Sequence, residues 1–335
     1  MYVCAFVRMY TLNKGDYFIK RIISVLLVLV LAFSLCACGG ASTMTMGTGG
    51  TAGTYYGYGG ILANQIKTSC GIAVNVVSTD GSKANILGID AGNYQLATVQ
   101  SDVMAYAFEG SRSFEKEGKL NSFRVIGGLY AEAVQLLTMD ANIKSVADLR
   151  GKKVSIGAAG SGVYFNAIDI LAAAGLKESD IIPQYQSFAD SADALKDGKI
   201  DAAFIVAGAP TPAIQELCTT ADAYLVPIDG TVAENLMKAS PYYTTYKIPA
   251  GTYDGQTAEV TTVTVKATLI VSANASEDDV YNITKAIFDN IDAITAAHAK
   301  GAELSLANAT EGMTAPFHKG AAKYFAEKGI TVVTE

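Results

Sequence analysis

The sequence predicts an α/β protein of two lobes, joined by a hinge of two crossing strands. Three observations support this prediction. Strand, polar loop and helix alternate through residues 43–102, and the same succession returns in residues 152–210. Alternation of this kind is typical of parallel α/β sheets. Two long β-rich runs, at 123–139 and 258–273, lie where strands would cross from one lobe to the other.

Residues 1–37 have the features of a lipoprotein signal peptide. The basic pair Lys20-Arg21 precedes an apolar run over residues 22–35, which leads into the letters LCAC. The run is shorter than the about 20 apolar residues that a membrane span needs. The LCAC stretch resembles a bacterial lipobox, which implies cleavage before Cys38 and lipidation of that cysteine. We therefore expect an extracytoplasmic protein that a lipid anchors to the cell membrane, and an uncleaved anchor is the alternative.

The charge of the chain argues against some classes of partner. The whole sequence has 25 basic and 32 acidic residues, a net charge of −7. Removal of residues 1–37 takes away four basic residues and one acidic residue, which brings the net charge to −10. This balance argues against nucleic acid and against a polybasic membrane contact. An anionic ligand is still compatible with it, because backbone dipoles can bind one without basic side chains.

The first lobe is predicted from its alternating elements. Apolar residues recur at helical spacing after the first glycine-rich loop, and β-branched residues fill the next expected strand. In order, we expect a strand at 43–46, a glycine loop at 47–53, a helix from 54, a strand at 71–77, a polar loop at 78–82, a helix at 83–92 and a strand at 94–100.

The second lobe is predicted from an internal repeat. The segment 152–175 is again a strand, a glycine loop, an aromatic residue and a helix. Chance similarity between Ala- and Gly-rich α/β units is the alternative explanation. The common order of three matched pairs favours two lobes of similar build. At offsets of 110, 109 and 106, these pairs are Gly47 with Gly157, Ser78 with Ser187, and Gly92 with Gly198.

The remaining segments complete the domain organisation. Residues 276–298 have an amphipathic spacing that predicts one helix, with Ser276 as its N-cap. A polar, tyrosine-rich stretch at 240–256 is expected as an excursion of the second lobe. We therefore expect a signal peptide at 1–37, a linker at 38–44, the first part of lobe 1 at 45–136, lobe 2 at 137–258, and the return strand with the second part of lobe 1 at 259–335.

The motifs give little support to an enzyme. The letters GTGGTA at 47–52 formally match a dinucleotide fingerprint, with Asp80 as the acid for the ribose. The spacing to Asp80 is long, and an exported protein has little access to NAD. The sequence contains no phosphate-binding loop with its lysine, no G-x-S-x-G motif and no metal-binding histidine spacing. We expect no catalytic residue, metal or cofactor, and a dinucleotide-dependent oxidoreductase is kept as an alternative.

A binding site is predicted where the two glycine loops face each other. The loops 47–53 and 157–162 each precede a helix, whose free N–H groups carry partial positive charge. Glycine lets the backbone come close to a carboxylate. The polar loop 78–82 adds hydroxyl groups, and tyrosine can cover the apolar part of a ligand. We therefore expect a small anionic ligand in a cleft between the lobes.

The order of these motifs resembles one family of receptors. The marks are GTGGTAGTYYGYGG, STDGSKANI, VQSD, GKKVSIGAAGSG, DGKIDAAF with AGAP, and APFHKGAAKYFAEKGI, which together extend over residues 45–329. They are similar to the solute receptors of TRAP transporters, in the TAXI branch. The resemblance implies a periplasmic-binding-protein fold of type II, a ligand such as glutamate or 2-oxoglutarate, and delivery to a sodium-driven membrane permease. The sequence departs from the family pattern at Lys319, where a proline is usual.

The resemblance also implies which residues hold the ligand. Their role would be to offer hydrogen-bond donors to ligand carboxylates. A monomer is expected, with the solute, TRAP-type permease subunits and the membrane as its partners. A ligand-sensing surface lipoprotein without a transport role is a further alternative. The implied ligand residues are Thr48, Gly49, Thr51, Tyr55, Thr79, Gly81, Ser82, Asn85, Gln100, Ser101, Ser161, Gly162 and Pro210.

Overall fold

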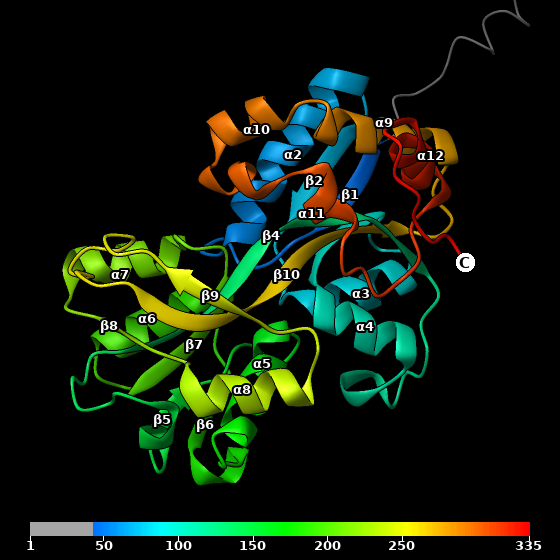
Figure 1. Ribbon diagram of the computed structural model, residues 1–335. Coiled ribbons are helices and arrows are strands. Elements are labelled where there is room, and N and C mark those ends of the chain that lie inside the picture. Colours follow the sequence, from blue (N-terminus) through cyan, green and yellow to red (C-terminus); the bar gives the residue numbers. More distant parts are fainter. Residues whose placement is uncertain (1–42) are drawn as a thin grey trace, which may run out of the picture. The chain divides into compact units, whose positions relative to one another are not determined.

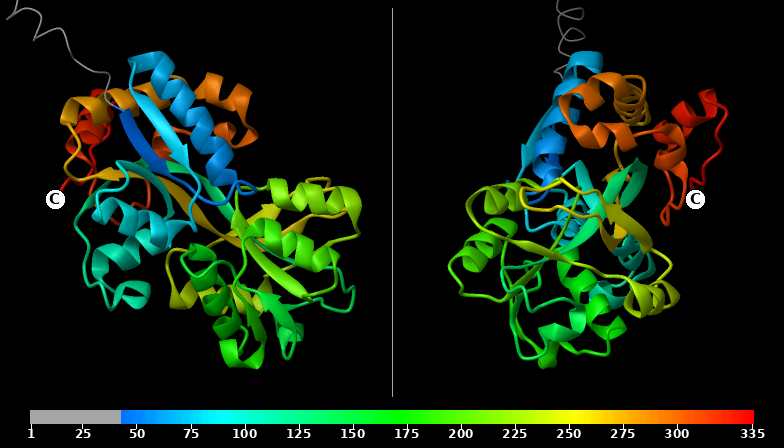
Figure 2. Two further views of the ribbon diagram at one scale, coloured as in Figure 1. Left: turned by 180° about the vertical axis from the view of Figure 1, so that it is seen from behind. Right: turned by 60° about the vertical axis from the view of Figure 1, so that its left-hand side comes forward.

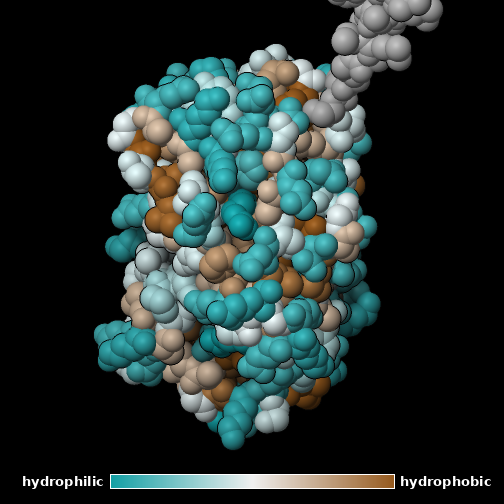
Figure 3. All heavy atoms as spheres, turned by 90° about the vertical axis from the view of Figure 1, so that its right-hand side faces the viewer, coloured by the Kyte–Doolittle hydropathy of each residue, from teal (hydrophilic) through white to brown (hydrophobic). Residues whose placement is uncertain are grey.

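The computed structural model describes residues 43–335. The expected signal peptide and the expected lipidation site, Cys38, lie outside the described residues. Within residues 43–335, none of the helices combines the length and the apolar character needed to cross a membrane. The face drawn in Figure 3 is mostly hydrophilic, with small and separate apolar patches.

The described part of the chain folds around one ten-stranded mixed sheet, in the order β2-β1-β3-β10-β4-β7-β5-β6, with β8 paired to β4 and β9 paired to β10 (Figure 1). Within each half, the strands β1, β2 and β3 and the strands β5, β6 and β7 run parallel. The strands are β1 Thr43–Gly47, β2 Ala73–Val77, β3 Leu96–Gln100, β4 Phe123–Thr138, β5 Lys153–Ser155, β6 Ile182–Gln184, β7 Ala202–Ala207, β8 Tyr224–Val226, β9 Thr244–Ile248 and β10 Val260–Ser272.

Helices cover both faces of the sheet. In lobe 1, α2, α9 and α10 lie on one side and α3 and α4 on the other (Figures 1 and 2). The helices are α2 Thr54–Cys70, α3 Ser82–Asp90, α4 Ser101–Glu109, α5 Gly162–Ala173, α6 Phe188–Lys196, α7 Pro212–Thr220, α8 Gly230–Ala239, α9 Glu277–Phe288, α10 Ile291–Ala297, α11 Leu306–Thr310 and α12 Lys319–Glu327. Short 3-10 turns lie at η1 Arg112–Phe114, η2 Val146–Leu149, η3 Glu178–Asp180 and η4 Ala299–Glu303.

The two long strands β4 and β10 form the hinge that the sequence predicts. They pair with each other in antiparallel fashion at the centre of the sheet. Their opposite ends belong to different lobes: β10 pairs with β3 at one end and with β9 at the other, and β4 pairs with β7 and β8 beyond the crossing. Because β4 is buried along almost its whole length, its sequence reads as a near-continuous apolar run. The two-lobe α/β fold with its crossing strands is therefore confirmed.

The hydrophobic cores divide along the same line. One core collects residues of β1, β3, α2, α4, α9 and α12, and it includes Tyr130 of β4 and Ala267 of β10. The other cores collect residues of β5, β7, α5, α7 and α8, and they include Ala133 of β4 and Val265 of β10. Each hinge strand therefore passes from one core to the other within a few residues. The boundaries expected at 136/137 and 258/259 stay a prediction.

The expected single helix over residues 276–298 is two helices, α9 and α10. Ser276 is the N-cap of α9, as expected, and its hydroxyl accepts from the N–H of Asp279 at 3.3 Å. The break falls at Asp289 and Asn290. The Asn290 side chain donates to the carbonyl of Ala286 at 2.9 Å, which competes with the backbone hydrogen bonds of a continuing helix.

Candidate functional site

A cavity between the two lobes is the candidate site. The space between its walls measures about 620 Å³, part of which is open to solvent. Both lobes contribute to its wall. The lining residues are Gly49, Gly50, Gly53, Thr54, Tyr55, Thr79, Asp80, Gly81, Ser82, Gln100, Glu132, Ala158, Ser161, Gly162, Val163, Gln186, Ser187, Phe188, Val206 and Ala207.

Five helices begin at this cavity. Each offers backbone N–H groups and the positive end of its dipole to the enclosed space. In the first three, the side chain of the N-cap residue makes no hydrogen bond to the helix start. The N-cap residues, all of them in the lining, are Gly53 of α2, Gly81 of α3, Gln100 of α4, Ser161 of α5 and Ser187 of α6.

The charged side chains of the lining are acidic. They are Asp80, which is exposed at the rim, and Glu132, which is 1% exposed in the middle of β4. The lining contains no lysine, arginine or histidine. Positive potential in this cavity therefore comes from backbone N–H groups, while the two acidic groups lie at its rim, in Asp80, and deep inside it, in Glu132.

Glu132 is held in place by neighbouring polar groups. The hydroxyl of Tyr55 donates to Oε1 of Glu132. Ala131 precedes Glu132 in β4, and its backbone N–H donates to the carboxylate of Glu303 at 2.7 Å. Glu303 also forms an ion pair with Lys300 at 2.5 Å. Burial, above any other cause, raises the pKa of Glu132 well above its ordinary range, and the hydrogen bond from Tyr55 acts against this rise. An empty cavity thus favours a neutral Glu132, and a cation beside it would restore its charge.

Most of the ligand residues implied by the sequence lie in this lining. They come from both lobes, as the two-loop hypothesis requires. Those in the lining are Gly49, Tyr55, Thr79, Gly81, Ser82, Gln100, Ser161 and Gly162.

The other implied ligand residues lie outside the lining. The Thr48 hydroxyl donates to the carbonyl of Val77 at 2.7 Å. The buried amide of Asn85 donates to the carbonyls of Thr48 and Thr98 at 2.6 and 2.8 Å, so it ties together the loops that follow neighbouring strands. These two side chains hold the loops from behind.

Three further implied residues also lie outside the lining. The hydroxyl of Ser101 accepts from the N–H of Lys266 on the hinge strand β10 at 3.2 Å. Thr51 is exposed at the tip of the glycine loop, and Pro210 follows a cis peptide bond after Ala209. A motif match places a residue near a site, but the direction of its side chain depends on the packing around it.

Part of the lining was not predicted from the sequence. Glu132 lies within an apolar run that was assigned to the hinge. The sequence feature that could have indicated its role is an acidic residue within a strand whose other residues are mostly apolar. The apolar wall from lobe 2, formed by Val163, Phe188, Val206 and Ala207, was also not anticipated. These residues come from α5, α6 and β7, which only the folded lobe brings together.

The lobes touch each other on several sides of the cavity. The N–H of Ala84 donates to the carbonyl of Gly160 at 3.2 Å, and the hydroxyl of Thr54 donates to the carbonyl of Gly208 at 2.8 Å. At Gly162, a Cβ atom would lie 1.7 Å from Oε1 of Gln100, so the absence of a side chain is what allows this approach. The structure thus has its lobes closed.

Among residues 43–335, no group of three or more His, Cys, Asp or Glu side chains is placed to hold a metal ion.

Comparison with known proteins agrees with this architecture. The chain resembles in structure a protein of Bordetella bronchiseptica RB50, with a TM-score of 0.52, 18% identity, and coverage of 85% of this chain and 89% of that one. It also resembles a Listeria monocytogenes protein described as a putative L-cystine ABC transporter, with a TM-score of 0.50, 20% identity, and coverage of 79% and 98%. Likeness at this level establishes the two-lobe fold of type II periplasmic binding proteins. A family model described as NMT1-like matches residues 46–329, and the chain therefore belongs to the NMT1-like family.

Proposed function

We propose that the protein is an extracytoplasmic solute-binding protein, which closes its two lobes around a small amino acid and delivers it to a membrane permease. The observation that carries the proposal is the lining of the cavity. Five helix N-termini and one buried carboxyl group surround it, without any basic side chain. Such a lining complements a ligand that has both a negative and a positive group.

The helix N-termini would bind the carboxylate of the ligand. Free N–H groups at a helix start form an anion site without basic side chains. The start of α3 in lobe 1 lies against the loop that leads into α5 in lobe 2, where the N–H of Ala84 donates to the carbonyl of Gly160. A carboxylate held by both lobes would draw them together, which couples binding to closure.

Glu132 would bind the ammonium group. A buried carboxylate is costly unless it is paired, and in the empty cavity burial raises the pKa of Glu132 well above its ordinary range. An ammonium group at hydrogen-bond distance would keep Glu132 ionised. A second ligand carboxylate at that position would be repelled by the ionised form. Of the ligands expected from the sequence, this favours an acidic amino acid such as glutamate over 2-oxoglutarate.

The identity of the permease and the anchor are also part of the proposal. A TRAP-type permease and a lipid on Cys38 are supported by the sequence resemblance to TAXI receptors and by the lipobox. The alternative is an ABC-type permease, since one protein of similar fold is described as an ABC transporter component. Co-purification of the lipidated protein with the permease subunits from membranes would distinguish the two types, and mass spectrometry of the mature N-terminus would test the lipid.

The ligand class can be tested with two matched compounds. Glutarate has the carbon chain and both carboxylates of L-glutamate but lacks its ammonium group. We expect calorimetry to find that L-glutamate binds about 30-fold or more tightly than glutarate, a difference of ~2 kcal/mol for a buried charged pair. The variant Glu132→Gln should lose this preference, whereas Asp80→Asn at the exposed rim should keep it. Equal binding of both compounds by the wild type would refute the role of Glu132.

A further inference from the structure

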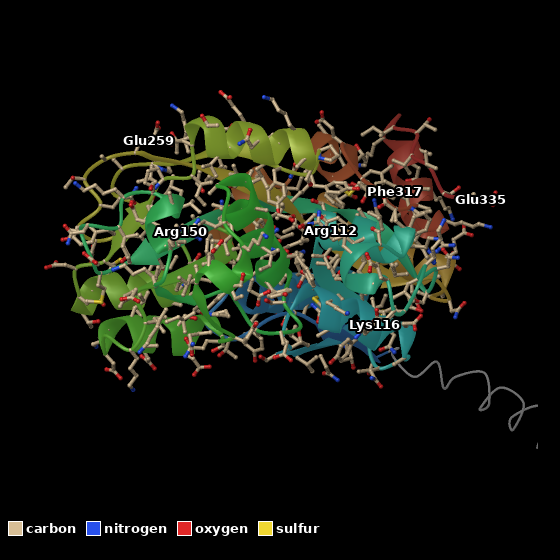
Figure 4. The ribbon with its side chains drawn as sticks, turned by 90° about the horizontal axis from the view of Figure 1, so that it is seen from below. Arg112, Lys116, Arg150, Glu259, Phe317 and Glu335 are labelled. Atoms are coloured by element: carbon tan, nitrogen blue, oxygen red, sulfur yellow. The ribbon has the colours of Figure 1, made fainter. Side chains whose placement is uncertain are left out.

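The lobes make a second contact on the α4 side of the cavity, away from the glycine loops. It joins Asp102 of α4 and Arg112 of η1 in lobe 1 to Asn166 and Asp169 of α5 and to Tyr243 in lobe 2. The amide of Asn166 donates to Oδ2 of Asp102 at 2.9 Å and to the hydroxyl of Tyr243 at 2.7 Å. Tyr243 donates to Asp169 at 3.2 Å, and Arg112 pairs with Asp169. Figure 4 shows Arg112 where the two lobes meet.

Two buried oxygen atoms of this network have no hydrogen-bond donor. Asp102 and Asn166 are both 0% exposed, and the Oδ1 atom of each is buried without a hydrogen bond. The two amide hydrogens of Asn166 are used, and the hydroxyl hydrogen of Tyr243 goes to Asp169. Two oxygens that need donors therefore lie on the two partners of one hydrogen bond between the lobes. One proton on Asp102 would neutralise its carboxylate and supply the missing donor.

We propose that closure of the lobes is coupled to the uptake of one proton by Asp102, so that the protein binds its solute more tightly as the pH falls. The proposal goes beyond the proposed function and rests on it for one link, the closure of the lobes around a solute. The proton would enter the latch, here defined as Asp102, Arg112, Asn166, Asp169 and Tyr243. The chemical identity of the solute is not part of it.

The electrostatics of the latch agree with this geometry. Burial is the main cause that raises the pKa of Asp102 to about 7, and the carboxylate of Asp169 on α5 adds to the rise. The N–H groups at the start of α4 and the Asn166 amide act in the opposite direction. With the lobes apart, Asp102 would face water and titrate near its ordinary pKa of about 3.9. A pKa that is higher in the closed form means that closure takes up a proton and is favoured as pH falls through about 7.

The other titratable groups around Asp102 do not account for tighter binding at low pH. Tyr106 on the same helix and Tyr243 have pKa values raised above their ordinary range, so both stay neutral. Arg112 stays charged beside Asp169, whose own pKa is raised by burial. Glu132 on β4 also faces Asp102, and its protonation at low pH would weaken rather than strengthen the binding of an ammonium group. A test must therefore compare variants at each pH.

Calorimetry with L-glutamate at pH 6 and pH 8 tests the proposal. From the two pKa values, we expect wild-type affinity to rise roughly tenfold between pH 8 and pH 6. Asp102→Asn, which imitates the protonated acid, should abolish this rise and bind at least tenfold more tightly than the wild type at pH 8. Asp169→Asn is the matched control, since it removes the neighbouring carboxylate of the latch; it should bind more weakly and keep the pH dependence, displaced to lower pH because Asp169 adds to the rise in the pKa of Asp102.

Small-angle scattering without any ligand gives a second measurement. The wild-type protein should have a smaller radius of gyration at pH 6 than at pH 8. At pH 8, the Asp102→Asn variant should have a smaller radius of gyration than the wild type. The same pH response in wild type and Asp102→Asn, or loss of the response in Asp169→Asn alone, would overturn the proposal. A response to Na⁺ in place of pH would also overturn it. If L-glutamate fails to bind, the proposed function fails, while scattering still decides the role of Asp102.

Discussion

A methyl group at position 162 should prevent the lobes from closing. In Gly162→Ala the added Cβ would lie 1.7 Å from Oε1 and 2.5 Å from Cδ of Gln100, far inside contact distance. The colliding atoms are the flexible end of the Gln100 side chain, which lines the cavity, so this side chain must either turn into the space of the ligand or hold the lobes apart. Overpacking of this kind costs about 1–3 kcal/mol, which corresponds to a loss of affinity of about 5- to 150-fold.

Calorimetry with L-glutamate measures this loss, and two further variants locate its cause. The double variant Gly162→Ala/Gln100→Ala should close again, because the side chain that collides with the new methyl group is gone. Gly60→Ala, on the exposed face of α2 with no atom near the added Cβ, should leave affinity unchanged. The thermal unfolding midpoint of ligand-free Gly162→Ala should stay close to that of the wild type, since neither lobe core changes. Wild-type affinity in Gly162→Ala would show that the closed contact between Gln100 and Gly162 is absent from the bound state.

Three further predictions concern stability and the second glycine loop. Asn85→Ala should lower the free energy of unfolding by about 1–3 kcal/mol in urea denaturation, because the buried carbonyls of Thr48 and Thr98 each lose an amide hydrogen bond and only that of Thr48 keeps another side-chain donor. Asn235→Ala on the exposed face of α8 should have little effect. Ser161→Ala removes the cap of α5 and should cost about 1 kcal/mol of stability and weaken L-glutamate binding; an unchanged affinity would leave Ser161 with a capping role alone. Lys285 above all, with Lys328 and Tyr324, holds the pKa of Asp289 well below its ordinary range, so its contribution to stability is present above about pH 4 and is lost as the pH falls further. Acid titrations of Asp289→Asn should therefore show a smaller loss of stability below about pH 4 than those of the wild type.

The sequence by itself determined the architecture. Alternating strand, glycine loop and helix are local patterns, and their repetition at nearly constant offset predicted two similar lobes. The long runs that became β4 and β10 were recognisable as crossing strands, because both are long and rich in residues that favour strands. Glycine loops before helices also predicted the helix start at Thr54 and a second helix start directly after the loop 157–162, where α5 begins at Gly162.

Only the tertiary structure decided which side chains face the cavity. Thr48 and Asn85 belong to the same motifs as Gly49 and Ser82, yet the packing of β1 against β2 and β3 turns them behind the loops. Side-chain direction depends on contacts between segments far apart in the chain, and a motif does not contain these contacts.

The positions of the buried charged groups could also not be predicted from the sequence. Glu132 is one acid in an apolar strand, and its position in the cavity follows from the crossing of the lobes. Asp102 and Asn166 are separated by 64 residues, and neither has an unusual sequence context. Their importance arises from shared burial and from missing donors, which exist only once the two lobes have closed around the same space.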